Sequence, residues 1–289
     1  AVEFFADFLR LFYPSKATRL DLRSVRFRDK ETFTDLPRGK KRLPDVLAEV
    51  RTRGGKRELI LVHVEIEARR RPRFEARMFR YYMALRLRHD LPVFPIALVL
   101  RGTRRGLDRP LHREGVLGDE VCVFRFWRIG LTSLPGARYV ERENALAPAL
   151  AALMRPPGLS RTEWRLKCAR RIARIRASEA RKGLLMDCVE SYLPLSDEEQ
   201  TQYNRLVESR ENREVGVMRK LWSEQLREEG ERRGEKRAMR ETLLRQLRVK
   251  FGPLPRGIAQ RVKDLDGVGR LHALLKRILT ASSIEEMGL

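Results

Sequence analysis

Acidic side chains gather on one face of a strand predicted over residues 59–67 (LILVHVEIE). Side chains alternate between the two faces of a strand, so His63, Glu65 and Glu67 share one face with the leucines of the segment. The other face is apolar throughout. On an ordinary surface strand two such carboxylates would only be solvated, and that alternative stays open for this segment taken alone. The strong apolar character of the rest of the strand favours a functional pair.

The preceding strand, predicted over residues 44–51, strengthens this interpretation because Asp45 and Glu49 share one of its faces. If residues 54–56 (GGK) form a three-residue hairpin loop, residues whose numbers sum to 110 pair with each other, and Asp45 lies opposite Glu65. A two-residue loop would move Asp45 to the other face. Like charges opposed across a ladder destabilise it, so we expect a cation between them.

Three carboxylates, from Asp45, Glu65 and Glu67, supply the hard oxygen ligands that Mg²⁺ or Mn²⁺ prefers. A metal held there lowers the pKa of a bound water and stabilises charge that develops on a phosphodiester. For Glu49 we expect a salt bridge rather than a place in the metal site. For His63 we expect a packed side chain rather than a ligand.

The sequence also carries a family resemblance. Residues 43–45 (LPD), followed about twenty residues later by 65–67 (EIE), resemble the motif of the PD-(D/E)xK nucleases. More specifically, residues 63–67 (HVEIE), 77–81 (RMFRY) and 91–96 (LPVFPI) resemble the Rpn-type recombination-promoting nucleases, which are also called transposase-like proteins. The resemblance covers roughly residues 1–200.

This resemblance implies an α/β fold with a restriction-endonuclease-like core, a mixed sheet flanked by helices, followed by an all-α C-terminal region. It also implies a metal-dependent DNA endonuclease with a role in DNA recombination, whose catalytic residues are the metal ligands Asp45, Glu65 and Glu67. The chain departs from the family at Glu67, where the superfamily has lysine and Rpn-like proteins have glutamine. A catalytically inactive nucleic-acid-binding protein on the same fold is therefore one alternative, and a structural adaptor that acts through charged helices is another.

The charge of the chain favours a polyanionic partner. Its 62 Lys and Arg against 39 Asp and Glu give a net charge of +23. We expect DNA to be bound beside the carboxylates, with RNA left open as the partner. Arginine could also supply there the positive charge that Glu67 does not. It stays protonated, however, and cannot act as a base. The predicted contacts are Arg69, Arg70, Arg71, Arg73, Arg77 and Tyr81. A solvated basic loop is the alternative for each arginine, and for a second basic loop over residues 101–113.

The elements that position these residues form a nuclease-like core over residues 1–135. Apolar periodicity and turn signals predict its elements. They are a helix at 1–13, strands at 21–27, 44–51 and 58–68, a helix at 74–89, and strands at 93–100 and 120–129.

Pro135 and Gly136 mark the exit from this core, and beyond Pro148 the pattern is helical only. We divide this part into a helical extension at 136–226, a charged linker or solvated helix at 227–242, and a small helical domain at 243–289. Ser196 and Glu199 have the spacing of a capping box. The last domain resembles one of unknown function that often follows these nucleases. Self-association through the C-terminal helices is left open.

The remaining features of the sequence indicate reduced cysteines and argue against a zinc site and a membrane segment. Three cysteines without a CxxC pair predict buried thiols and a reducing cytoplasm, and the four histidines lack zinc-ligand spacing. No apolar run is long enough to cross a membrane, and the amphipathic start does not resemble a signal peptide, so no membrane partner is expected.

Overall fold

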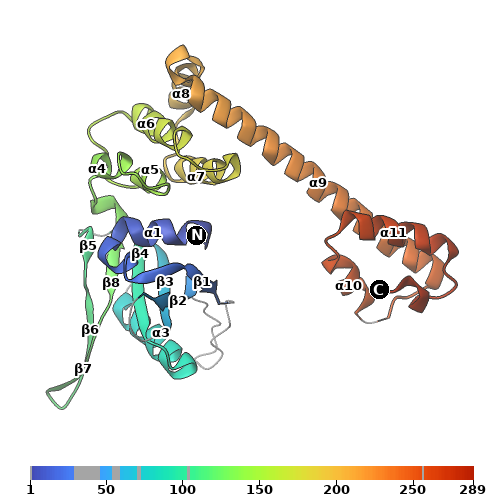
Figure 1. Cartoon of the computed structure of the whole chain (residues 1–289), viewed down its shortest axis with the longest axis horizontal. Coiled ribbons are helices and arrows are strands. Elements are labelled where there is room, and N and C mark those ends of the chain that lie inside the picture. The colour runs from blue at the N-terminus through green and yellow to red at the C-terminus, as the bar shows by residue number, and fades with distance from the viewer. Residues whose placement is uncertain (1, 29–45, 54–58, 70–72, 103–104, 256) are drawn as a thin grey trace. The chain divides into compact units, whose positions relative to one another are not determined.

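The computed structural model describes residues 2–28, 46–53, 59–69, 73–102, 105–255 and 257–289 (Figure 1). The chain divides into two units, Ala1–Met218 and Arg219–Leu289. Each unit has a hydrophobic core of its own. The boundary between them falls inside one long helix, α9 (Arg213–Phe251).

A six-stranded mixed sheet is the centre of the first unit, with the strand order β1-β2-β3-β4-β8-β5. Its first three strands are antiparallel, β3, β4 and β8 are parallel, and β5 is antiparallel to β8. The strands are β1 (Leu20–Phe27), β2 (Val46–Thr52), β3 (Leu59–Arg69), β4 (Val93–Arg101), β5 (Leu107–Asp108) and β8 (Trp127–Gly130). The mixed α/β class expected from the sequence is confirmed.

Helices cover both faces of this sheet. One face contributes Val46, Ala48 and Val62 to a core shared with α1 (Phe5–Phe12) and with the helices that follow the sheet. The other face is covered by α3 (Phe74–His89). On this face Leu47 of the sheet packs with Leu85 of the helix, and Ala97 of the sheet packs with helix residues that include Met78. Strand β4 is buried along residues 94–100, as is typical of a parallel strand covered on both sides.

The helices that flank the sheet follow their sequence patterns. Phe5, Phe8, Leu9 and Phe12 recur at helical spacing and are buried, and α1 ends before Pro14 begins the short α2 (Pro14–Ala17). A short 3₁₀ turn (Val2–Phe4) precedes α1. Helix α3 has the bounds that its periodicity predicts, because Asp90 takes a left-handed conformation and caps its end.

One predicted strand is wrong. The segment 120–129 divides into β7 (Asp119–Arg125), which forms a separate two-stranded sheet with β6 (Leu111–Val116), and β8, which joins the central sheet. Phe126 is fully buried at the point where the chain changes partner. Apolar alternation continues through that point, so the sequence pattern does not reveal the change.

Helices after residue 135 complete the first unit and share a core with the sheet. They are α4 (Gly136–Val140), α5 (Ala147–Ala151), α6 (Arg161–Ala173), α7 (Glu179–Tyr192) and α8 (Asp197–Glu208). A 3₁₀ turn (Leu131–Ser133) leads into them and another (Arg210–Asn212) precedes α9. The capping box predicted for Ser196 and Glu199 is present at the start of α8. A second one, of Ser160 and Glu163, begins α6.

The second unit packs the end of α9 against α10 (Ile258–Asp264) and α11 (Val268–Thr280), followed by a 3₁₀ turn (Glu285–Met287). Its core includes Leu243, Leu247, Val262 and Leu271. The charged segment 227–242 is helical, part of α9, and largely solvated. Among the helices that the structure describes, none combines the length and the apolar character that a bilayer crossing requires.

Candidate metal and nucleic-acid site

The register between β2 and β3 has the residue sum predicted from the hairpin loop. Val46 pairs with Val64, and the ladder continues in step to Arg51 and Leu59, so that each pair sums to 110. Asp45 lies outside the described residues, directly before the first pair. Its place opposite Glu65 therefore stays a prediction that extends this ladder by one residue.

The backbone of β3 gives Glu65 and Glu67 definite positions in the sheet. Glu65 is the register partner of Ala97, and Glu67 is the partner of Val99. Since paired residues of parallel strands share a face, positions 65 and 67 fall on the face of the sheet that α3 covers, where Ala97 packs with Phe74 and Met78. The side chains of Glu65 and Glu67 lie outside the described part of the structure, as does that of His63.

A row of residues crosses the sheet at this level. From Glu65 the row passes to Ala97 on β4, then to Arg128 on β8 and Asp108 on β5. In this row Ala97, a small residue, lies between Glu65 and Arg128. The row joins the predicted acidic positions to a charged cluster at the edge of the sheet.

Arg128 organises that cluster. Its Nε donates a hydrogen bond to Oδ1 of Asp108 over 2.9 Å, and its Nη2 donates to Oδ2 over 2.5 Å. Nη1 of Arg128 lies 3.6 Å from Oε1 of Glu75, in the first turn of α3. The side chains of Arg128 and Asp108 are both 12% exposed, so this bidentate pair is largely screened from water. It ties the start of α3 to the sheet.

The arginines predicted to bind DNA lie along the connection from β3 to α3. Arg69 ends β3 as the register partner of Arg101, and Arg70 and Arg71 lie outside the described residues. Arg73 is exposed and precedes α3 in a left-handed conformation. The Arg77 guanidinium lies over the Phe74 ring, 4.9 Å from its centroid.

Tyr81 is one turn from Arg77 on α3, as predicted, but its side chain is only 3% exposed. The ring is packed inside the first unit and does not face solvent, where a nucleic acid would bind. In this structure Tyr81 therefore helps to hold α3 in place.

Glu49 has the role expected from the sequence. It is buried, and Nε of Arg28 donates a hydrogen bond to its Oε2 over 2.7 Å. This ion pair satisfies the carboxylate without a metal. The described residues contain no group of three His, Cys, Asp or Glu side chains placed to hold a metal ion, and the trio of Asp45, Glu65 and Glu67 is not among the side chains so described.

Two of the three cysteines, Cys168 and Cys188, are poorly suited to act as nucleophiles. All three are free, and Cys168 is fully buried in the core of the first unit. Burial raises the pKa of the Cys168 thiol to about 12 and that of Cys188 to about 11. Both side chains are therefore protonated near neutral pH, which makes them packing groups.

Sequence reasoning missed Glu75, Asp108 and Arg128 as parts of this region. Asp108 lies within the predicted second basic loop. Arg128 lies within the segment 120–129, which the sequence pattern predicts as a single strand. Only the pairing of β8 with β4 and β5 brings them together. Comparisons of the chain with family models, with curated proteins and with solved structures gave no match.

Proposed function

We propose that the first unit is a metal-dependent DNA endonuclease that hydrolyses phosphodiester bonds, with Asp45, Glu65 and Glu67 as the catalytic metal ligands. In this proposal the sheet is a PD-(D/E)xK core of the recombination-promoting, transposase-like type. The β2–β3 register carries the proposal, because it keeps the residue sum of 110 up to the pair Val46 and Val64. One further step of that ladder would bring Asp45 opposite Glu65.

The donor set suits Mg²⁺ or Mn²⁺, since three carboxylates offer oxygen ligands and leave room for water and phosphate oxygens. A bound metal would supply a water of lowered pKa and would stabilise charge on the phosphodiester. The chain itself would hold the metal with the three acids and the DNA backbone with arginines. Arg69 ends the acidic strand and Arg70, Arg71 and Arg73 follow it, so these arginines are suited to grip phosphates beside the scissile one. Arg77 is less suited to this role, because its Nε and Nη2 atoms are buried.

The charge of the chain and its cysteines agree with this proposal. A net charge of +23 favours a polyanion such as DNA. Free thiols suit a reducing compartment such as the cytoplasm. Self-association through the helices of the second unit remains a prediction.

The test is a nicking assay on supercoiled plasmid with Mg²⁺, with Mn²⁺ and with a chelator. The proposal expects cleavage with either metal, none with the chelator, and none by Asp45→Asn, which should still bind DNA. Asp90→Asn is the matched control, because the Asp90 side chain is 98% exposed at the end of α3 and Asn tolerates its left-handed backbone. Cleavage that persists in Asp45→Asn would refute the metal assignment.

The same assay separates a second candidate, a DNA-binding protein without catalysis. The observation that favours it is Glu67, which stands where the related nucleases have glutamine or lysine. This candidate expects tight DNA binding by the natural chain and no cleavage with either metal. Negligible affinity for duplex DNA at low salt would instead favour the structural adaptor.

A further inference from the structure

An arginine-lined cavity lies on the other side of the central sheet from α3. It has a volume of about 810 Å³ and is bounded by α1, by residues 142–148 and by the end of α6 with the turn that follows. All of these elements belong to the core on the α1 face of the sheet. Its cationic lining consists of Arg10, Arg142, Arg171, Arg174 and Arg176, against two carboxylates, Asp7 and Glu143.

Two of the arginines are neutralised by acids outside the lining. Arg174 Nη2 lies 2.7 Å from Oε1 of Glu214. Arg171 Nε lies 3.6 Å from Oε2 of Glu141. These two side chains therefore line the cavity but add little to its net charge.

The other arginines keep donors for a ligand. Arg142 donates from Nη1 to the carbonyl oxygen of Leu11 over 3.2 Å and stacks on Tyr139, which fixes its plane and leaves its remaining N–H groups. Arg176 makes no hydrogen bond or ion pair with any residue that the structure describes, and its side chain is exposed. A guanidinium held by stacking is well suited to bind an oxyanion in a bidentate manner.

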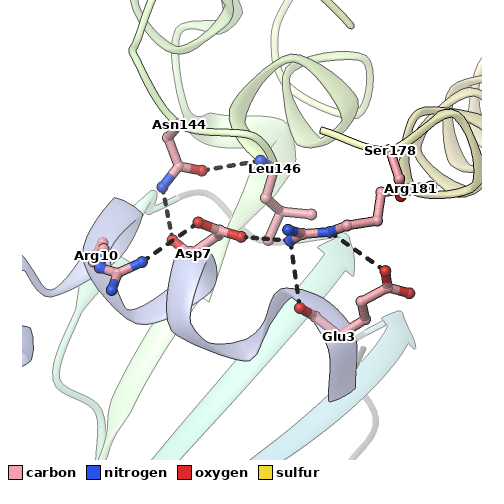
Figure 2. A network of polar contacts seen from close by, with 7 residues as sticks. All are labelled: Glu3, Asp7, Arg10, Asn144, Leu146, Ser178 and Arg181. Carbon is pink, nitrogen blue, oxygen red and sulfur yellow. Dashed lines mark hydrogen bonds and ion pairs between the residues drawn. The ribbon is translucent and has the colours of Figure 1, made fainter. Parts of the chain in front are cut away.

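The cavity carboxylates offset part of this charge. Asp7 is shared by two arginines, since its Oδ2 accepts a hydrogen bond from Arg181 Nη2 over 3.1 Å and its Oδ1 lies 3.7 Å from Arg10 Nη1 (Figure 2). Glu143 has no partner among the described residues. The lining thus keeps an excess of positive charge.

The wall between α1 and residues 142–148 is rigidly built. Asn144 donates from Nδ2 to the backbone carbonyl of Asp7 over 2.9 Å, and its Oδ1 accepts a hydrogen bond from the backbone N–H of Leu146 over 3.0 Å (Figure 2). One side chain therefore joins segments more than a hundred residues apart. Arg142 belongs to this wall and is therefore held in place before a ligand arrives.

We propose that this cavity binds the phosphate groups of a nucleotide-sized ligand, through Arg10, Arg142 and Arg176. Planar guanidinium groups match phosphate oxygens in pairs. The volume falls in the range of small-molecule sites, about 300–1,000 Å³. The phosphates come either from a free nucleoside polyphosphate or from a short stretch of nucleic-acid strand. The site does not depend on the proposed nuclease activity, because it uses none of the same residues.

The test is a binding titration of the full chain with ATP and, separately, with a short single-stranded oligonucleotide. Chelator is present throughout, so that neither cleavage nor a metal at the acidic strand contributes. The variant Arg10→Ala/Arg176→Ala removes two lining charges, and Asp7 keeps its contact with Arg181. Its matched control is Arg155→Ala/Arg205→Ala, because these two exposed side chains lie in the same unit outside the cavity. Glu143→Gln removes the unpaired carboxylate.

The lining variant is expected to raise the dissociation constant at least about tenfold, and the control by less than about twofold. Glu143→Gln is expected to lower it about two- to threefold, since a repulsive charge is removed. If ATP binding follows this pattern, the ligand is a free nucleotide; if only oligonucleotide binding does, the ligand is a strand. Equal losses in the two double variants, or no binding of either probe, would overturn the proposal.

Discussion

Val46 and Val64 are paired in the antiparallel ladder of β2 and β3, at the end of the described ladder where the predicted metal ligands begin. The pair has the residue sum that a three-residue loop over residues 54–56 imposes. Because a shift by one residue would reverse every side chain of the strand, this register is a condition for the acids to share a face. The proposed metal site therefore depends on this one alignment of two strands.

Glu67 is proposed as a metal ligand, at a position where the nucleases that the sequence resembles have glutamine or lysine. Glu67→Gln and Glu67→Lys each remove a carboxylate from the three-acid site, so we expect plasmid nicking to slow at least about tenfold in both variants. Single-turnover rates of nicked-circle formation measure this, with Asp90→Asn as the control. Faster nicking by Glu67→Lys would contradict Glu67 as a ligand and would indicate that the residue at this position neutralises charge on the phosphate.

DNA binding should depend steeply on salt. Arg73 is exposed between β3 and α3, and Arg73→Asn removes its charge while tolerating the left-handed backbone. We expect the slope of log K against log salt concentration to fall by about 0.9 for each phosphate that the variant no longer neutralises. Anisotropy titrations of a labelled duplex over a salt series provide the slope. Arg205→Ala on α8 should leave it unchanged, and an equal change in both variants would argue against a local phosphate interaction at Arg73.

Removing one partner of the Arg128–Asp108 pair should lower the stability of the fold strongly, whereas replacing both partners by apolar residues should lower it little. Arg128→Ala would leave the largely buried Asp108 carboxylate without its cation, so we expect a loss of about 3–5 kcal/mol in the free energy of unfolding. Arg128→Met combined with Asp108→Leu should recover most of it. Urea denaturation measures both. As a control, Arg113→Ala breaks an exposed pair with Glu120 and should cost less than about 1 kcal/mol; an equal cost at both sites would contradict the buried role.

Much of the fold could be predicted because its signals are local. Helix α3 has the predicted bounds since its apolar period stops at Asp90, and the β2–β3 register has the residue sum predicted from the two glycines of the sequence. The partition of residues 119–130 between two sheets could not be predicted, because the choice of partner at Phe126 is made by long-range packing. The same holds for the arginine-lined cavity, whose walls come from segments more than a hundred residues apart in the sequence.

The buried thiols predict a loss of stability in alkali. Since folding raises the pKa of Cys168 above its ordinary value of 9.0 to about 12, the folded state favours the protonated thiol. The stabilisation is complete below pH 9 and is lost as the pH rises from there toward 12. Between about pH 8 and about pH 10 it should fall by about 1.4 kcal/mol. Urea unfolding of Cys168→Val at both pH values should show a pH-dependent loss smaller by that amount, and an identical loss in both proteins would contradict a buried thiol.

Direct measurement of metal binding shows whether Asp45, Glu65 and Glu67 converge on one divalent ion. Free Mn²⁺ can be followed by electron paramagnetic resonance while the full chain, Asp45→Asn and Asp90→Asn are each titrated. We predict binding by the natural chain and by Asp90→Asn, with affinity at least about tenfold weaker in Asp45→Asn. The same affinity in all three proteins, or no binding by any of them, would rule out such a site.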